Sequence, residues 1–217
     1  MKYYPAYLNI TDRICVVVGG GDIAERKIER LLECGASVVV VGKKLGPKLD
    51  DMKSEGKIKH IAGDYQEEHI ENAFMVIGAT DRDDVNERIY RDAKRKGIPA
   101  NIVDDPDRCD FILPSIFQQG DLRIAISTGG KSPALAKKLR LEMEKNYGPE
   151  YKTLLDIMGA VREKVITRGH SSEENRKLFE SLLNSDILRY IREKNINKVK
   201  KIVNDLTGEN IDGYFIV

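Results

Sequence analysis

The stretch VVVGGGDIAERK, residues 16–27, decides the fold of this chain. A run of β-branched residues stops at three glycines, and a charged, helix-favouring segment follows. Gly19, Gly21 and Ala24 give the spacing G-x-G-x-x-A between a predicted strand and a predicted helix. Glycine at the first two positions lets the backbone turn and approach a pyrophosphate, and a small third residue lets the helix pack on the strand. The stretch predicts a dinucleotide-binding turn, with a tight turn that binds no nucleotide as the alternative.

Apolar runs and helical patterns alternate on both sides of this turn. The patterns predict helices over 22–35 and 83–97, a helix or turn over 45–56, and strands over 14–18, 37–42, 58–63, 73–80 and 98–103. Near-continuous apolar strands that alternate with helices are typical of a parallel sheet covered on both faces. We therefore predict an α/β fold with an N-terminal Rossmann-like parallel sheet.

The pattern changes in the second half of the chain. Two strands joined by a QQGD turn are predicted within 111–128, and a helix over 132–148 with Ser132 as its N-cap and Pro133 in its first position. Three further helical stretches, 151–166, 171–183 and 185–206, precede a tail without assignment. We expect boundaries near residues 113 and 148, which give a nucleotide-binding Rossmann domain at 1–113, a central region at 114–148 and a C-terminal helical domain at 149–217.

The bulk composition excludes several classes of protein. Lys and Arg number 36 against 35 Asp and Glu, a net charge of +1, so no global field attracts nucleic acid or an anionic membrane. No apolar run approaches a membrane span, and the first residues lack the apolar core of a signal peptide. Cys15, Cys34 and Cys109 are widely spaced and give no disulfide framework or CxxC pair. We expect a cytoplasmic protein without nucleic-acid or membrane partners.

The residues that would touch a cofactor lie where predicted strands end. Dinucleotide-binding domains usually place an acid after the second strand for the ribose hydroxyls, but Lys43 and Lys44 stand there instead. These lysines suit the 2′-phosphate of NADP or are simply solvated. Asp22 opens the helix after the glycines and is interpreted as a cap or first-turn acid. Thr80 and Asp81 end the fourth predicted strand. For these two residues, a contact with the cofactor and a helix cap are equally good interpretations.

The stretch NIVDDPDRCDF, residues 101–111, follows the fifth strand, so Asp104 and Asp105 fall at the same carboxyl edge. A carboxylate beside a nicotinamide is suited to act as a general base while a hydride leaves the substrate. The alternative is an Asp-Pro turn stabilised by side-chain to backbone bonds, which spacing alone favours. Cys109 is interpreted as a small buried residue rather than a nucleophile.

A third stretch, STGGKSP at 127–133, leads from a strand into a helix. Its glycines, hydroxyls and lysine make a candidate cradle for a carboxylate or phosphate, formed by Ser127, Thr128, Gly129 and Lys131. A helix cap with a flexible lead-in is an equally good interpretation. His60, His69 and His170 show no metal-ligand spacing, and no metal site is expected.

Together, four stretches resemble one family closely. They are YLNITDRICVVVGGGDIAERKIERLLECGASVVVV (7–41), GATDRDDVNERI (78–89), NIVDDPDRCDFILPSI (101–116) and IAISTGGKSPALAKKLR (124–140). In this order, over about residues 3–145, they resemble precorrin-2 dehydrogenase, the dehydrogenase module of siroheme synthase. The helical remainder is compatible with the family but carries no matching motif.

The resemblance implies NAD-dependent oxidation of precorrin-2 to sirohydrochlorin by a homodimer, with Fe²⁺ as a further substrate in some members. It also implies that the central region, 114–148, is the dimerisation region. It places the family's functional aspartate on Asp104, and cofactor contacts on the glycine loop with Asp22 and Ile23 and on the two lysines after the second strand. A serine that is phosphorylated in some members falls on Thr128 here. Because the substrate carries eight carboxylates, the STGGK loop gains a role in binding it. NAD is the expected cofactor, and NADP stays open.

Two other functions remain compatible with the residues. A regulatory module that senses NAD(H) explains the first hundred residues, but not the DDPDRCDF and STGGKSP stretches. A monofunctional chelatase with the same fold needs no nucleotide.

Overall fold

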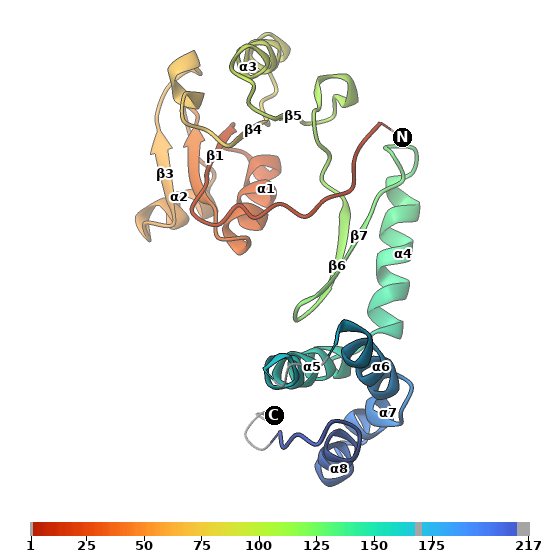
Figure 1. The fold of residues 1–217 in the computed structure, drawn as a ribbon. Helices are drawn as coiled ribbons and strands as arrows, with labels where there is room; N and C mark the ends of the chain where they lie inside the picture. Colours follow the sequence, from red (N-terminus) through yellow and green to blue (C-terminus); the bar gives the residue numbers. More distant parts are fainter. Residues whose placement is uncertain (1, 168–170, 212–217) are drawn as a thin grey trace. The chain divides into compact units, whose positions relative to one another are not determined.

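The computed structural model describes residues 2–167 and 171–211 of the chain. The chain divides between Leu113 and Pro114 into two compact units, and each is described by itself (Figure 1). His170 and the end of the predicted tail, residues 212–217, lie outside the described residues.

The first unit contains a five-stranded parallel sheet, which confirms the predicted α/β fold. Its strands are β1 (Ile14–Val18), β2 (Ser37–Val41), β3 (Ile58–Ile61), β4 (Met75–Gly78) and β5 (Ala100–Ile102), in the order β3-β2-β1-β4-β5. Strand order reverses between β1 and β4, so the loops after these two strands diverge at the carboxyl edge. Ligands of doubly wound sheets bind at such a point.

Helices cover both faces of the sheet because the strands are apolar on both. On one face α1 (Asp22–Glu33) and α2 (Pro47–Ser54) bury apolar side chains that include Ile28 and Leu49. On the other face α3 (Asp83–Lys96) and the short 3₁₀ helix η1 (Glu67–Ile70) bury Ile70 and Ile89. Figure 1 shows α1 and α3 on opposite sides of the strands.

Several predicted strands are longer than the strands in the structure. The strands predicted over 58–63, 73–80 and 98–103 end earlier or begin later, and their outer residues belong to loops. The sequence also gives no sign of η1 or of a second 3₁₀ helix, η2 (Pro106–Arg108). Both lie in connections where local hydrogen bonds, rather than apolar periodicity, decide the conformation.

The second unit begins with a hairpin and continues in helices. The hairpin pairs β6 (Ser115–Gln119) with β7 (Leu122–Ile126) in antiparallel fashion, and α4 (Pro133–Asn146) follows. The Ser132 hydroxyl accepts a hydrogen bond from the Leu135 N–H at 3.2 Å, so the predicted N-cap is confirmed. Then come α5 (Glu150–Ile166), α6 (Ser172–Leu183), α7 (Ile187–Arg192) and α8 (Ile196–Thr207).

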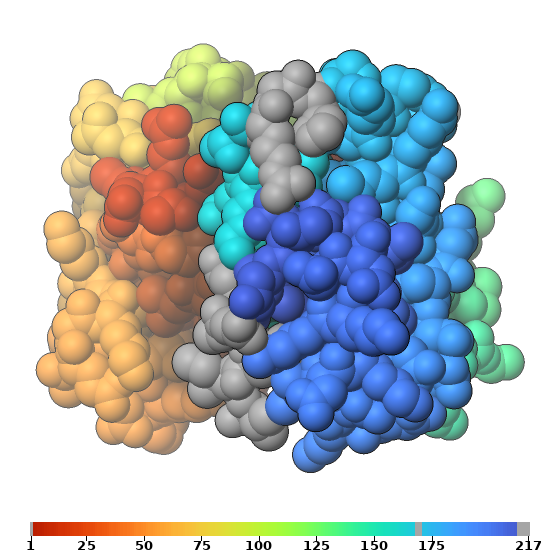
Figure 2. Space-filling model, turned by 60° about the horizontal axis from the view of Figure 1, so that its bottom comes forward, coloured from red at the N-terminus to blue at the C-terminus, as the bar shows by residue number. Residues whose placement is uncertain are grey.

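The stretch 185–206 was expected as continuous helix, and that prediction is wrong. Lys194 has a φ of +54°, and the Asn195 side chain accepts the Lys198 N–H at 3.2 Å, which starts a new helix. The helices share an apolar cluster that includes Ile157, Leu182 and Val203. Figure 2 shows the surface formed by α6, α7 and α8 in blue shades.

Within the described ranges 2–167 and 171–211, no helix combines the length and the apolar character that crossing a bilayer requires.

Candidate dinucleotide site

Gly19, the first glycine of the loop, lies close to the residues that end β2 and follow β4. Gly19 has a φ of +125°, which side chains rarely tolerate, and a Cβ there would lie 2.3 Å from the Ala79 carbonyl oxygen. Its N–H donates to the Val41 carbonyl at 2.9 Å. Gly19 thus lets the loop after β1 pass tightly against the loops after β2 and β4.

The second glycine, Gly20, lies outside the G-x-G-x-x-A pattern, and sequence reasoning did not assign it a role. A Cβ on Gly20 would stand 2.1 Å from the Lys44 carbonyl oxygen. The Gly46 N–H donates to the Gly20 carbonyl at 2.8 Å. The loop before α1 is therefore packed against the loop before α2.

The third glycine, Gly21, faces open space. It is the N-cap of α1 and makes no side-chain cap bond, and a Cβ there would meet no protein atom within 4 Å. The first N–H groups of a helix lack intrahelical acceptors and carry a partial positive charge. An unobstructed helix N-terminus behind tightly packed glycines fits a dinucleotide pyrophosphate.

Two predicted cofactor contacts begin this helix. Asp22 is its first residue and exposed, so it is a first-turn acid rather than a cap. Ile23 follows with 39% of its surface exposed. Ala24 is fully buried, which matches its predicted role in packing helix on strand.

The two lysines after β2 are both exposed, and one is paired. Lys43 Nζ lies 3.0 Å from Asp64 Oδ1, and Asp64 follows β3. His60, within β3, bonds to the loop after β2, because its Nε2 donates to the Gly42 carbonyl at 2.8 Å. Asp64 is a charged neighbour of this edge that the sequence did not reveal, since it depends on β3 lying beside β2.

Thr80 and Asp81 follow β4. The Thr80 hydroxyl lies 2.8 Å from Asn86 Oδ1 and accepts the Arg82 N–H at 3.2 Å. Asn86 is buried and donates back to the Thr80 carbonyl at 3.0 Å. The Thr80 side chain therefore stabilises the turn that leads into α3, whose N-cap is Arg82 and has no side-chain cap bond, whereas Asp81 is exposed.

The two aspartates after β5 have different surroundings. Asp105 Oδ1 accepts the N–H groups of Asp107 and Arg108 at 3.1 Å each, and Oδ2 accepts Arg108 Nε at 2.5 Å. The Arg108 guanidinium holds the pKa of Asp105 below its usual range. Asp104 is exposed at a φ of +62°, and in the described part of the chain no hydrogen bond or ion pair engages its carboxylate.

The Asp104 loop is fixed to its surroundings by Arg108. The guanidinium also contacts the carboxylates of Asp83 and Glu87 on α3, the latter at 3.3 Å. Asp110 Oδ2 accepts the Ala100 N–H at 3.0 Å, which returns the chain along β5. The loop is therefore anchored on both sides of η2, while Asp104 itself stays available.

Lys27 is a further functional candidate that sequence reasoning missed. It lies on α1, is half-buried, and interacts electrostatically with Asp104 and Cys109. Burial lowers the pKa of its ammonium group, with the charge of Arg26 adding to that effect and Asp104 opposing it. Over residues 2–167 and 171–211, no ion pair or hydrogen bond occupies this ammonium group. The sequence could not reveal this role, because the electrostatic partners of Lys27 follow a strand that is distant in the sequence.

The STGGK loop belongs to the second unit. The Ser127 hydroxyl accepts the Gly129 N–H, and the Thr128 hydroxyl accepts the Ser132 N–H, each at 3.1 Å. Lys131 is exposed. The loop thus has the local bonds of a helix lead-in, with the Lys131 ammonium available to an anion.

The remaining candidates have structural surroundings. His69 Nδ1 accepts the Gln66 N–H at 3.1 Å in a capping box, and the Cys109 thiol lies 3.0 Å from the Asp105 carbonyl. Burial raises the pKa of Cys109, which argues against a nucleophile. In the described ranges no group of three or more His, Cys, Asp or Glu side chains is arranged to hold a metal ion.

Comparisons with known proteins agree with this geometry. A family model described as "Putative NAD(P)-binding" matches residues 6–115, about half of the 217 residues, and one described as "Sirohaem biosynthesis protein central" matches residues 119–146. A siroheme synthase of Actinobacillus succinogenes is 36% identical over 216 residues, which cover 100% of this chain and 45% of the relative. Siroheme synthase 3 of Aeromonas hydrophila is 38% identical over 188 residues, covering 87% of this chain and 40% of the relative.

The chain thus spans about half the length of the curated relatives it matches. Among solved structures, one described as "SirC, precorrin-2 dehydrogenase" matches with a TM-score of 0.73 and 24% identity. The match covers 92% of this chain and 100% of the other. This likeness shows a shared fold.

Proposed function

The chain belongs to the NAD(P)-binding family of sirohaem-biosynthesis proteins, and from that premise we propose that it oxidises precorrin-2 to sirohydrochlorin with NAD. The observation that carries the proposal is the carboxyl edge of the sheet. There an unobstructed helix N-terminus at Gly21 and the unengaged carboxylate of Asp104 belong to one unit. The names of the siroheme synthase relatives and of the precorrin-2 dehydrogenase structure support the same substrate.

The cofactor, when bound, accepts a hydride at its nicotinamide ring. The Gly19–Gly21 turn and the first turn of α1 would hold the pyrophosphate through backbone N–H groups. Asp22, Ile23, Lys43, Lys44 and the Thr80–Asp81 backbone are the proposed further contacts.

Removal of two hydrogens from precorrin-2 sends one out as hydride and one as a proton. Asp104 is the proposed acceptor of that proton, because an unpartnered carboxylate is free to bind a ring N–H or C–H of the macrocycle. The Lys27 ammonium interacts electrostatically with Asp104. Arg108 keeps the loop in place while the proton moves.

The substrate carboxylates need cations and N–H donors. We propose that Ser127, Thr128, Gly129 and Lys131 bind them in the second unit. Fe²⁺ insertion into the product is a proposed further step with Fe²⁺ as substrate, for which Asp104 would accept pyrrole protons.

A homodimer is part of the proposal. An isolated two-stranded sheet is marginally stable, and of the β6–β7 pair only Phe117 is buried. Leu135 and Leu141 of α4 are 47% and 41% exposed. A second copy that covers this surface would account for both features, and light scattering on the purified chain tests it.

The test is an anaerobic spectrophotometric assay with precorrin-2 and NAD, repeated with NADP. Growth of the sirohydrochlorin spectrum that depends on nucleotide is the expected result. Asp104→Asn should abolish turnover and leave NADH binding within about twofold, since the residue touches substrate rather than cofactor. Asp107→Asn, a charge change three residues away, is the matched control and should stay active.

Three outcomes would contradict parts of the proposal. Nucleotide binding without turnover would favour an NAD(H)-sensing module. Metal insertion into sirohydrochlorin without nucleotide would favour a chelatase. Unchanged turnover in Asp104→Asn would leave Asp104 as a turn residue.

A further inference from the structure

We propose that Asp64 sets the preference of the dinucleotide site for NAD over NADP by neutralising Lys43. The inference rests on the proposed function, because it concerns the cofactor of the same site. It explains why a domain with two lysines and no acid after β2 would still take the cofactor without a 2′-phosphate.

The position of Lys43 makes it the residue that meets the adenosine ribose. In doubly wound folds the first residues after β2 contact the ribose 2′ position, where an acid selects the 2′-hydroxyl and a cation accommodates the 2′-phosphate. Here β2 ends at Val41, and Lys43 stands two residues beyond it. Considered alone, Lys43 would favour NADP.

Asp64 pairs with Lys43 and offsets its positive charge. Its Oδ1 lies 3.0 Å from Lys43 Nζ and 3.8 Å from a terminal nitrogen of Arg82, which precedes α3. Arg82 is also held by Asp84 through two bonds of 3.2 and 2.6 Å. Lys43 and Arg82 are therefore already engaged by carboxylates, which a 2′-phosphate would have to displace or face as like charges.

The neighbouring backbone fixes Asp64 in this place. The Gly42 N–H donates to the Ile61 carbonyl at 3.1 Å, and the Gly63 N–H lies 3.4 Å from the Gly42 carbonyl. Tyr65 is 4% exposed and packs in the cluster under α3, with its hydroxyl 3.3 Å from Asp92 Oδ2. Asp64 thus sits between two anchored residues, beside the lysine it neutralises.

Asp64→Asn keeps the side-chain shape and removes the charge, so Lys43 becomes free to bind a 2′-phosphate. Titrations of nicotinamide fluorescence with NADH and NADPH on the full chain measure both dissociation constants without any substrate. The ratio of the two constants should move toward NADPH by about three- to tenfold at low salt, and the gain should shrink at 0.5 M salt as screening grows. Lys43→Gln combined with Asp64→Asn should lose the gain.

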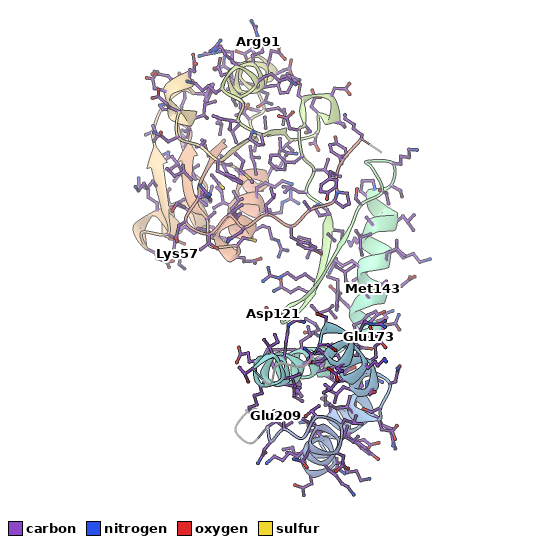
Figure 3. All side chains as sticks on the ribbon, in the orientation of Figure 1. Lys57, Arg91, Asp121, Met143, Glu173 and Glu209 are labelled. Atoms are coloured by element: carbon purple, nitrogen blue, oxygen red, sulfur yellow. The ribbon has the colours of Figure 1, made fainter. Side chains whose placement is uncertain are left out.

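Glu55→Gln is the matched control. Glu55 pairs with Lys57 at 2.6 Å, and the two side chains are 55% and 59% exposed, against 61% and 66% for Asp64 and Lys43. Lys57 directly precedes β3, at the opposite edge of the sheet (Figure 3). The same loss of charge there should leave the ratio unchanged.

The outcomes distinguish a failure of the proposed function from a failure of the proposal about Asp64. If wild-type protein binds neither dinucleotide, the proposed function fails and the inference fails with it. If NADH binds but Asp64→Asn leaves the ratio within about twofold, or weakens NADH without a gain in NADPH, the charge argument is wrong while the proposed function stands. A wild-type preference for NADPH would also overturn it.

Discussion

Two neighbouring glycines of the same loop should respond to alanine in opposite ways. At Gly20 the new methyl group would lie 2.1 Å from the Lys44 carbonyl oxygen, so the loops before α1 and α2 must separate by about 1 Å to restore an ordinary contact. That movement also stretches the 2.8 Å bond from the Gly46 N–H to the Gly20 carbonyl. At Gly21 a methyl group would meet no protein atom within 4 Å.

The magnitudes follow from these contacts. Overpacking costs about 1–3 kcal/mol and a lost hydrogen bond about 1 kcal/mol, so Gly20→Ala should destabilise by about 2–4 kcal/mol. For a chain of this size the corresponding fall in Tm is about 4–16 °C. Gly21→Ala exchanges one N-cap residue for a poorer one and should cost under about 1 kcal/mol, yet its methyl group occupies the approach to the helix N-terminus. We expect a loss of dinucleotide affinity of about tenfold or more there.

Thermal scans by circular dichroism measure the first effect, and NADH fluorescence titrations measure the second. A melting temperature of Gly20→Ala within about 2 °C of wild type would contradict the predicted clash with the Lys44 carbonyl. Normal NADH binding by Gly21→Ala would show that the open space in front of α1 is not the cofactor site.

Three further predictions concern the loop after β5 and the thiols. Arg108→Met should lower kcat about 10- to 100-fold with NADH affinity within about twofold, because it releases the loop that positions Asp104; turnover and binding assays separate the two, and Arg108→Lys should recover part of the loss. Since the folded-state pKa of Asp105 lies below its unfolded value, its stabilising contribution is present above pH ~4 and is lost as pH falls through the folded-state pKa. The difference in Tm between wild type and Arg108→Met should therefore narrow on acidification, and a constant gap would contradict the pairing. At pH 8, iodoacetamide followed by peptide mapping should label exposed Cys34 first and Cys15 last, since burial raises the pKa of Cys15 to about 11; equal rates would contradict the burial of Cys15.

The sequence predicted the sheet because its signals are local. Continuous apolar strands, the glycine spacing and the alternation with helices each depend on a few neighbouring residues. The same is true of Ser132 as a helix cap. The helix break near Lys194 was missed because the residue carries no glycine or proline signal, although it adopts a φ of +54°.

The charged partners of the site could not be predicted in this way. The pair of Lys43 with Asp64 needs β3 to lie beside β2, and the contacts of Arg108 with α3 need β5 to lie beside β4. Strand order is a property of the whole sheet, so no window of sequence contains it. Gly20 belongs to the same class, since its closest contact comes from the loop after another strand.

The two aspartates after β5 have different surroundings within one short motif. A turn needs a carboxylate to cap its backbone, and a proton acceptor needs a carboxylate that nothing else occupies. In D-D-P the second aspartate precedes the proline and accepts two backbone N–H groups and the Arg108 guanidinium. Because Asp105 satisfies the turn, Asp104 is left at a φ of +62° with an unengaged carboxylate. Asp105 therefore fits the turn interpretation, and the catalytic role that we propose for Asp104 falls on the adjacent residue, whose carboxylate stays unengaged.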